Sequence, residues 1–353
     1  MHQTPCHIFI NSKKQIVMLS TQTTEEQEIM LAEEEFYNNP FQFSYNSLRK
    51  LLENPKKFYK EYVLGKREKL YGNYLIEGGL IHFLILEHND VQIEDRYAIM
   101  TDNLPSDNAM AIIDTIFDNN PEKETLDECL QEIDEQLSER NLYQTIKDFD
   151  KRVGKICDEK GRQYFEFLKN KEGKIIVDMN TLARCMKRAE EIKKNHELMH
   201  LIGQEDVQKG WAVYNEHEFS IDNVKNYEFG LKGILDNMVV DTEKKIVYIN
   251  DFKTTSRNIQ DFPESVKNHK YSLQAAIYCV LAKKCMKLSD DWKIEFSFIV
   301  IDKDDTTYRF RVSDNTMNLW LNELAHALHN ADFHISNRNF NLPYEFENNL
   351  VVL

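Results

Sequence analysis

The pattern of apolar and polar residues predicts an antiparallel hairpin between residues 231 and 255. Two apolar-rich runs are separated there by a polar turn at residues 241–244. Side chains alternate across a strand, so Asp251 and Lys253, two residues apart on the second run, project from the same face. Residues equidistant from the turn of a hairpin face each other, which places Asp236 of the first run near Asp251.

Similar patterns along the chain predict further strands and helices. Their order along the chain is helices, strands, one helix, strands and one helix. The predicted elements are helices over residues 44–63 and 77–87, a strand over 210–221, the hairpin, a helix over 271–284, strands over 293–302 and 306–313, and a helix over 315–330. Ser44 is a candidate N-cap for the first helix, which Asn54 and Pro55 interrupt. The sum is an α/β fold, a mixed sheet flanked by helices.

Two further segments of the sequence indicate where the domain begins and what is inserted into it. Residues 100–200 are charged and contain apolar residues at helical spacing, with no sharp linker on either side. We therefore expect one domain over residues 41–353 with a helical insertion at about 100–200 that lines or caps the substrate cleft. Residues 1–40 are polar and rich in Gln, Thr and Glu, and we expect a mobile or peripheral N-terminal tail.

Composition places the chain among globular proteins. With 353 residues and 42% apolar content, it can bury a substantial core. No stretch is long and apolar enough for a transmembrane span, and the N-terminus does not resemble a signal peptide, so we expect a cytoplasmic protein of a bacterium or of a phage-infected cell. Six scattered cysteines without a C-x-x-C pair predict reduced, mostly structural thiols.

The net charge of -15 argues against a protein that coats nucleic acid by bulk electrostatics. A local basic groove remains compatible with that charge. Lys and Arg gather in residues 54–69 and again in residues 184–194. Both runs are equally well explained as solvated helix faces.

The hairpin carries the groups of a hard-cation site. Two carboxylates within a few Å repel each other unless a cation or a proton lies between them. Mg²⁺ prefers such oxygen ligands, and it can activate water and polarise a phosphate. A neighbouring ammonium, here Lys253, can orient that water or neutralise charge on the phosphate. A surface hairpin with a salt bridge is the competing interpretation, because D-x-K alone is common by chance.

Two other motifs accompany the hairpin. Gln274 and Tyr278 lie one helical turn apart, hence on one helix face, and His82 lies within an apolar helix. The order His82, G-x-x-D ending at Asp236, D-x-K at 251–253 and Q-x-x-x-Y at 274–278 resembles the PD-(D/E)xK nuclease superfamily. The RecB-like branch with exonuclease VIII (RecE) is the most similar, and lambda exonuclease is a more distant relative. The resemblance covers roughly residues 41–330.

The resemblance implies a restriction-endonuclease-like core and a role for each motif residue. It implies that Asp236, Asp251, Lys253, Gln274 and Tyr278 are catalytic, with Gln274 and Tyr278 aligning Lys253 or a DNA phosphate. It further implies that Mg²⁺ or Mn²⁺ is held by Asp236, Asp251, His82 and the carbonyl of Phe252.

Four nearby side chains have simpler explanations. Histidine on an apolar helix is more often a satisfied core residue than a ligand, although the G-x-x-x-H setting of His82 fits the family. Glu77 is a weaker candidate, and the helix dipole alone would favour an acid there. Glu216 and Glu218 could reach the site, but a solvated strand face is the expected position for both.

The family resemblance implies a metal-dependent deoxyribonuclease. Within it we expect an exonuclease that acts on linear duplex ends in phage-type recombination, as a homo-oligomeric ring, beside a single-strand annealing protein. A structure-specific or restriction-type endonuclease is the main alternative, and a DNA- or protein-binding module without activity is the second. Relatives with an iron–sulfur cluster use one early and three late cysteines. Asn54 occupies the early position and no cysteine follows Cys285, so we expect no cluster and a colourless protein.

Overall fold

The computed structural model describes residues 24–39, 41–67, 73–87, 91–101, 103–224 and 227–347. The chain forms two compact units. The first comprises residues 1–70 and 206–353, and the second comprises residues 71–205. Most of the predicted N-terminal tail lies outside the described residues, apart from a helix, α2 (Thr24–Asn38).

The first unit is built on a six-stranded mixed sheet. Its strands are β1 (Gln42–Phe43), β4 (Trp211–Ile221), β5 (Gly230–Asp241), β6 (Ile246–Thr254), β7 (Lys293–Ile301) and β8 (Thr307–Arg311). Antiparallel pairing joins β4 to β5, β5 to β6 and β7 to β8, whereas β1 with β5 and β6 with β7 are parallel. The predicted α/β fold with a mixed sheet is confirmed.

The predicted hairpin is β5 with β6. Paired residues run from Asp241–Ile246 beside the turn to Asn237–Asn250. The Asp241 carboxylate accepts hydrogen bonds from the backbone N–H of Lys244 at 2.9 Å and from the indole of Trp211 at 3.0 Å. The bond from Lys244 closes the polar turn and helps to set the register of β5 against β6, and the bond from Trp211 ties the same carboxylate to β4.

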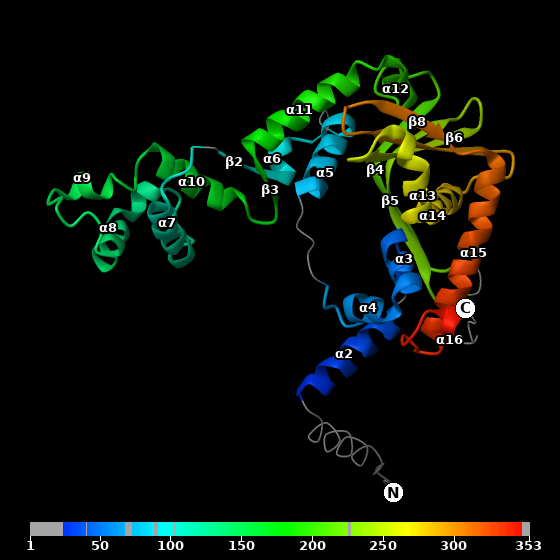
Figure 1. Cartoon of the computed structure of the whole chain (residues 1–353), viewed down its shortest axis with the longest axis horizontal. Helices are drawn as coiled ribbons and strands as arrows, with labels where there is room; N and C mark the ends of the chain where they lie inside the picture. The colour runs from blue at the N-terminus through cyan, green and yellow to red at the C-terminus, as the bar shows by residue number, and fades with distance from the viewer. Residues whose placement is uncertain are drawn as a thin grey trace, which may run out of the picture. The chain divides into compact units, whose positions relative to one another are not determined.

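Helices accompany the sheet in this unit, and one of them, α14 (Tyr271–Cys285), packs against its strands (Figure 1). They are α2, α3 (Tyr45–Glu53), α4 (Pro55–Phe58), a π-helix (Tyr59–Val63), a 3₁₀ turn (Ile259–Asp261), α13 (Phe262–Asn268), α14 (Tyr271–Cys285), α15 (Asp314–Ser336) and α16 (Tyr344–Glu347). Ser44 caps α3 through a reciprocal pair of hydrogen bonds with Ser47, as the sequence predicted for the N-cap. Asn54 ends α3 and its side chain caps α4, so the predicted interruption is also present.

Helix α14 is the central helix of the core. Its residues from Leu273 to Cys279 are all buried, together with Leu281 and Ala282. A helix that is apolar on all sides has to lie inside a protein. Apolar residues of the sheet and of α15 belong to the same core cluster, which includes Met238, Phe298 and Leu328.

The second unit is mainly helical. Its elements are α5 (Asn73–Leu86), α6 (Ile93–Arg96), β2 (Tyr97–Met100), α7 (Asp107–Asn119), a 3₁₀ turn (Leu126–Cys129), α8 (Leu130–Glu139), α9 (Phe149–Val153), α10 (Glu159–Asn170), β3 (Ile175–Asp178), α11 (Met179–Lys193) and α12 (His196–Leu201). The strands β2 and β3 pair in parallel. Among the described residues, no helix is long and apolar enough to cross a membrane.

Candidate active site

The ladder between β4 and β5 is interrupted at one position. Asn215 pairs with Asn237 and His217 pairs with Leu235, so Glu216 and Asp236 lie opposite each other, but they form no ladder pair. Glu216 has φ of 45°, in the left-handed region that a residue with a Cβ rarely adopts. Such backbone strain in the middle of a strand is concentrated at functional sites in proteins.

The interruption reverses the direction of the side chains. Residues on one face of a strand are normally an even number apart. Tyr214 and Phe219, five apart, both pack into the same core, and so do Leu235 and Met238, three apart. The two strands therefore switch faces together around Glu216 and Asp236, so their carboxylates are placed by a kink that the strand pattern does not contain.

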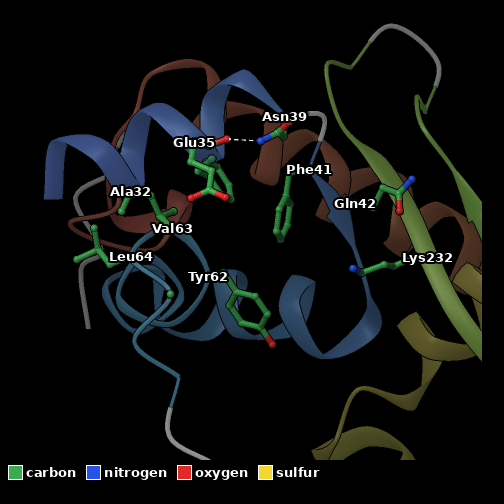
Figure 2. A pocket seen from close by; sticks show the side chains of 11 residues that line it. Ala32, Glu35, Asn39, Phe41, Gln42, Tyr62, Val63, Leu64 and Lys232 are labelled. Atoms are coloured by element: carbon green, nitrogen blue, oxygen red, sulfur yellow. Dashed lines mark hydrogen bonds between the residues drawn. The ribbon is translucent and has the colours of Figure 1, made fainter. Parts of the chain in front are cut away.

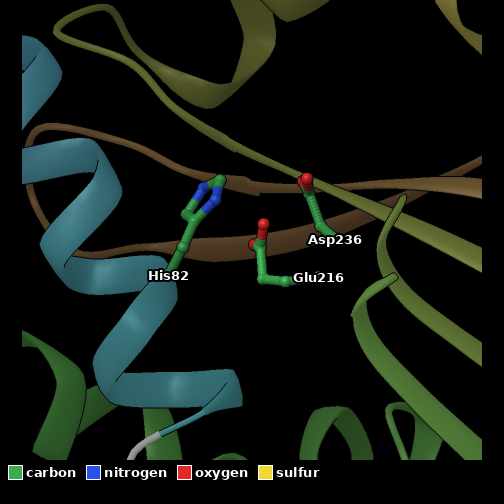
Figure 3. Close-up of side chains that lie close together, drawn as sticks. All are labelled: His82, Glu216 and Asp236. Atoms are coloured by element: carbon green, nitrogen blue, oxygen red, sulfur yellow. The ribbon is translucent and has the colours of Figure 1, made fainter. Parts of the chain in front are cut away.

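The carboxylates of Glu216 and Asp236 lie close together. One oxygen of each is within 4.8 Å of the other, and Figure 3 shows the two side chains beside each other, drawn with His82 of α5. Burial raises the pKa of Asp236 above its usual value. The reason is that a charged carboxylate loses its hydration there, and a bound cation would restore that stabilisation.

Asp251 and Lys253 form an ion pair at the end of β6. Asp251 is fully buried and the Lys253 side chain is 17% exposed. Burial by itself would lower the pKa of Lys253, but the charges of Asp251 and Asp236 outweigh it, so the pKa is raised. Lys253 is therefore an ammonium at neutral pH, and the prediction that Asp251 and Lys253 share one face is confirmed.

Asp236 is tied to the D-x-K strand through the main chain. Its Oδ2 accepts a hydrogen bond of 2.7 Å from the backbone N–H of Phe252. The carbonyl oxygen of Phe252, a predicted metal ligand, accepts a hydrogen bond of 3.4 Å from the ammonium of Lys253. Main-chain atoms of a single residue thus connect the first carboxylate with the lysine.

Gln274 and Tyr278 lie on one face of α14, as predicted. The amide of Gln274 donates a hydrogen bond of 3.0 Å to the phenol of Tyr278. The pKa of Tyr278 is raised well above its usual value by burial and by the charges of Asp251 and Asp236, so the phenol keeps its proton. The carbonyl oxygen of the Gln274 side chain is buried and has no hydrogen-bond partner among the described residues.

The glycine of the G-x-x-D motif makes room for this tyrosine. A Cβ at Gly233 would lie 2.8 Å from the Tyr278 ring, closer than real Cβ atoms come to their neighbours. The motif therefore has a steric cause: β5 can carry Asp236 past α14 only if the residue three positions earlier has no side chain.

Three asparagines support the strands behind the carboxylates. Asn250 donates a hydrogen bond of 2.8 Å to Asn237, which donates another of 2.8 Å to Asn215. Asn237 and Asn250 are buried. Each asparagine is the chain neighbour of Asp251, Asp236 or Glu216, so this row holds β4, β5 and β6 together beside the position where the regular pairing of β5 is interrupted.

Cationic and aromatic side chains adjoin the lysine. The Nζ of Lys253 lies 5.0 Å from the centre of the Tyr271 ring, a cation–π distance. Arg49 donates a hydrogen bond of 3.1 Å to the phenol of Tyr45, whose ring lies 6.3 Å from that of Tyr271. The pKa of His269 is lowered by burial and by Arg49 and Arg257. The structure therefore gathers positive charge near Lys253, outside the two basic runs that the sequence indicated.

Among the predicted site residues, the structure brings Asp236, Asp251, Lys253, Gln274 and Tyr278 together in the first unit. His82 lies on α5, in the second unit. Glu77 forms an ion pair with Arg184 within that second unit.

The expectation for Glu216, a solvated strand face, was wrong. The expected position fits Glu218, which is exposed. Glu216 differs from Glu218 in lying opposite Asp236. That position depends on the pairing of β4 with β5, which the sequence pattern does not show.

The donor set fits a divalent metal ion of the hard class. Glu216 and Asp236 offer carboxylate oxygens within 4.8 Å of each other, and the carbonyl of Phe252 is a further oxygen donor. Oxygen ligands of this kind suit Mg²⁺, Mn²⁺ and Ca²⁺. Without a cation between them, the two carboxylates on adjacent strands would repel each other. A divalent cation therefore suits the site by its charge as well as by its preference for oxygen ligands.

Comparison with known proteins agrees with this geometry. Residues 42–339 match the PD-(D/E)XK nuclease superfamily, and the chain belongs to this superfamily. Its members are nucleases that use divalent metals, so the protein is an enzyme that acts on nucleic acid. The crystal structure of a candidate exonuclease from Eubacterium rectale is similar at 11% identity and a TM-score of 0.44, over 94% of this chain and 95% of the other. No curated protein matches the sequence.

Proposed function

We propose that the protein is a Mg²⁺- or Mn²⁺-dependent deoxyribonuclease that hydrolyses phosphodiester bonds of DNA. One observation carries the proposal: Asp236 is bonded to the main chain of Phe252, between the ion-paired Asp251 and Lys253. Two carboxylates and an ammonium are thereby held at the end of one hairpin. Membership of the nuclease superfamily supports the same activity.

Asp236 and Asp251, with His82 and the carbonyl of Phe252, are the residues that we assign to the metal, and Glu216 joins them. When bound, a divalent cation polarises the phosphate and lowers the pKa of a coordinated water. The buried carboxylates supply the negative charge that makes such binding favourable. They also exclude other anions from the site, so DNA phosphate can approach only after that charge is neutralised.

Lys253 positions the attacking water and stabilises the negative charge that develops on the phosphate. Its pKa is raised by the neighbouring carboxylates, so in the resting protein it donates hydrogen bonds and does not accept a proton. Gln274 and Tyr278 lie behind it on α14, and we assign them to the alignment of Lys253 or of a DNA phosphate. The unpartnered oxygen of Gln274 is available to accept a hydrogen bond from a water or from Lys253.

We further infer an exonuclease of the RecE-like branch that degrades linear duplex from its ends during phage-type recombination. The order of the four motifs supports this branch. A closed homo-oligomeric ring, which would retain DNA between cuts, and a single-strand annealing partner belong to the same inference.

The experiment compares one plasmid in two forms. The protein is incubated with Mg²⁺ and either covalently closed circles or the same plasmid linearised. We expect degradation of the linear form alone, no cleavage in EDTA, and recovery with Mg²⁺ or Mn²⁺. Nicking of the closed circle at a comparable rate would identify an endonuclease. No cleavage of either form, with Mg²⁺ present and the protein folded, would contradict the nuclease proposal itself.

A further inference from the structure

A cation that helps to hold DNA at the candidate active site has to lie on the same face of the sheet as that site. Lys232 does not meet this condition. Figure 2 shows its side chain pointing from β5 toward Phe41 and Tyr62, in a hollow of about 410 Å³. Gly233, the next residue, faces Tyr278 of α14, and neighbouring side chains of a strand point to opposite faces. The hollow is therefore on the other side of β5 from α14.

The phenol of Tyr271, at the start of α14, is a hydrogen-bond donor beside Lys253. The Nζ of Lys253 lies 5.0 Å from the centre of the Tyr271 ring. The phenol forms no hydrogen bond with another described residue, and its oxygen is not fully buried. Burial raises the pKa of Tyr271 although the charges of Lys253 and Arg49 oppose the rise, so the phenol keeps its proton. An anion that accepts this proton in a hydrogen bond would be close to both cations.

The Arg49 guanidinium is held in one orientation by its neighbours. Its Nη1 donates hydrogen bonds of 3.1 Å to the Tyr45 phenol and of 3.4 Å to the main-chain carbonyl of His269. The Tyr45 phenol donates to the same carbonyl, and Nε of Arg49 lies 3.5 Å from Oε2 of Glu53. Nη2 forms no hydrogen bond with another described residue. The side chain is 32% exposed, so a fixed donor remains available to an anion.

The surroundings of Arg49 favour an anionic ligand. Its ion pair with Glu53 joins two side chains that both reach solvent, and an exposed pair of this kind contributes little. Arg257 is exposed and forms no ion pair with another described residue. The pKa of His269 is lowered by burial and then by the charges of Arg49 and Arg257, so both guanidinium groups lie near one imidazole. The region beside Lys253 therefore attracts anions, whereas the carboxylates of the site repel them.

We propose that Arg49 and Tyr271 bind the phosphate next to the scissile phosphate on the DNA strand that is cut. In the proposed reaction, Lys253 and the metal act on the scissile phosphate. Contacts run from Lys253 to Tyr271, from Tyr271 to Tyr45 and from Tyr45 to Arg49, which places the guanidinium for a different phosphate of the same strand. Two successive phosphates held in this way fix the direction of the backbone at the cut bond, as attack by a positioned water requires. The proposal rests on the deoxyribonuclease function and adds two substrate-binding residues to it.

The test uses DNA duplexes in which one phosphate at a time is replaced by an uncharged methylphosphonate. Binding is measured in Ca²⁺ in place of Mg²⁺, and gels verify that each duplex stays intact. Digestion of the all-phosphate duplex in Mg²⁺ identifies the first bond that is cut. For the unmodified protein, we expect methylphosphonates to weaken binding most at the scissile phosphate and at one phosphate next to it.

Arg49→Gln should weaken binding of the all-phosphate duplex roughly 10- to 150-fold, the range for a hydrogen bond between charged groups. The slope of log affinity against log salt should fall by about one unit, since one fewer phosphate is neutralised. The variant should no longer respond to the methylphosphonate next to the scissile phosphate, because two changes that remove the same contact are not additive. Its response at the scissile phosphate should remain.

Tyr271→Phe tests the phenol separately. This variant keeps the ring beside Lys253 and removes only the hydroxyl. We expect a loss of affinity of roughly 2- to 10-fold, the usual effect of one hydrogen bond, and a smaller response to the methylphosphonate next to the scissile phosphate.

Arg338→Gln is the matched control. Arg338 is exposed, and its guanidinium lies 4.1 Å from the centre of the Tyr37 ring, a contact of the same kind as that of Arg49 with Tyr45. This variant should bind every duplex as the unmodified protein does. Melting curves verify that all three variants are folded.

Two outcomes would overturn the proposal. Metal-dependent cleavage by an Arg49→Gln variant that binds DNA normally, or that still responds fully to every methylphosphonate, would remove the phosphate site and leave the nuclease function intact. A folded, unmodified protein that neither binds nor cuts DNA would overturn both.

Discussion

The backbone N–H of Phe252 donates a hydrogen bond of 2.7 Å to the carboxylate of Asp236. The regular ladder between β5 and β6 ends one residue earlier, at Asn237 and Asn250. Where β5 and β6 diverge, the carboxylate of Asp236, and not a main-chain carbonyl of β5, therefore accepts the hydrogen bond from the N–H of Phe252. Asp236 cannot move relative to the D-x-K strand without breaking this bond, which gives a defined spacing to the groups that we assign to the metal.

Glu216→Gln tests the acid that the tertiary structure adds to the site. Removing one of the carboxylates within 4.8 Å of each other should weaken Mn²⁺ binding about 10- to 100-fold, measured by titration calorimetry. Glu218→Gln, two residues away on the same strand and exposed, is the control and should bind Mn²⁺ normally. Equal affinities for the two variants would exclude Glu216 from the metal site.

Lys253→Met separates catalysis from metal binding. Asp251 is fully buried and would lose its ion-pair partner, so the metal-free variant should be less stable by roughly 3 kcal/mol. Mg²⁺ replaces the missing positive charge and should therefore raise the melting temperature of Lys253→Met more than that of the unmodified protein. Lys253→Met should cleave no DNA, even when Mg²⁺ is bound. A variant that cuts DNA at the normal rate would show that the D-x-K assignment is wrong.

Gly233→Ala should disturb the Gln274–Tyr278 pair by direct contact with the tyrosine ring. The new Cβ would lie 2.8 Å from the Tyr278 ring, and overpacking of this kind costs about 1–3 kcal/mol. We expect lower stability in urea unfolding and a reduced kcat. Gly79→Ala is the control, because its Cβ would meet its nearest neighbour, the Tyr97 phenol, at 3.7 Å. That mid-helix change should be neutral or stabilise by up to about 1 kcal/mol, and an equal loss in both variants would argue against the steric explanation.

Asn237→Val tests the buried asparagine row. It leaves the side chains of Asn215 and Asn250 without their shared partner, and a buried unsatisfied polar group costs about 1–3 kcal/mol. Chemical denaturation should show a loss in that range. Asn322→Val, at an exposed position of α15, should change stability by no more than about 0.5 kcal/mol. A similar small effect at Asn237 would mean that the row does not hold the strands.

Thiol reactivity provides a pH-dependent prediction. Burial raises the pKa of Cys279 to about 12, so at pH 8 almost none of it is the reactive thiolate. Burial also raises the pKa of Cys285, but this residue is only partly buried. Iodoacetamide at pH 8 should modify Cys285 first and Cys279 only after denaturation, as peptide mass spectrometry would show. Reaction of native Cys279 at the rate of Cys285 would contradict its burial.

The sequence by itself determined the elements whose pattern is local. The turn at residues 241–244 sets the register of the hairpin, and a period of two places Asp251 and Lys253 on one face. A period of 3.6 places Gln274 and Tyr278 together on α14. These relationships involve residues within about 25 positions of each other, so side-chain alternation and helix geometry are sufficient to predict them. The α/β fold follows from the order of such elements.

Only the tertiary structure decided which distant side chains meet. Glu216 faces Asp236 because β4 and β5 pair with this register and kink together, and a strand pattern gives no information on a break in its own alternation. Gly233 is required by Tyr278, which lies on a helix 45 residues later. The position of Lys232 beside Phe41 and Tyr62 likewise depends on β1 pairing with the start of β5. In each case, the contact results from packing between elements, where shape and register, and not local periodicity, determine which atoms lie within a few Å.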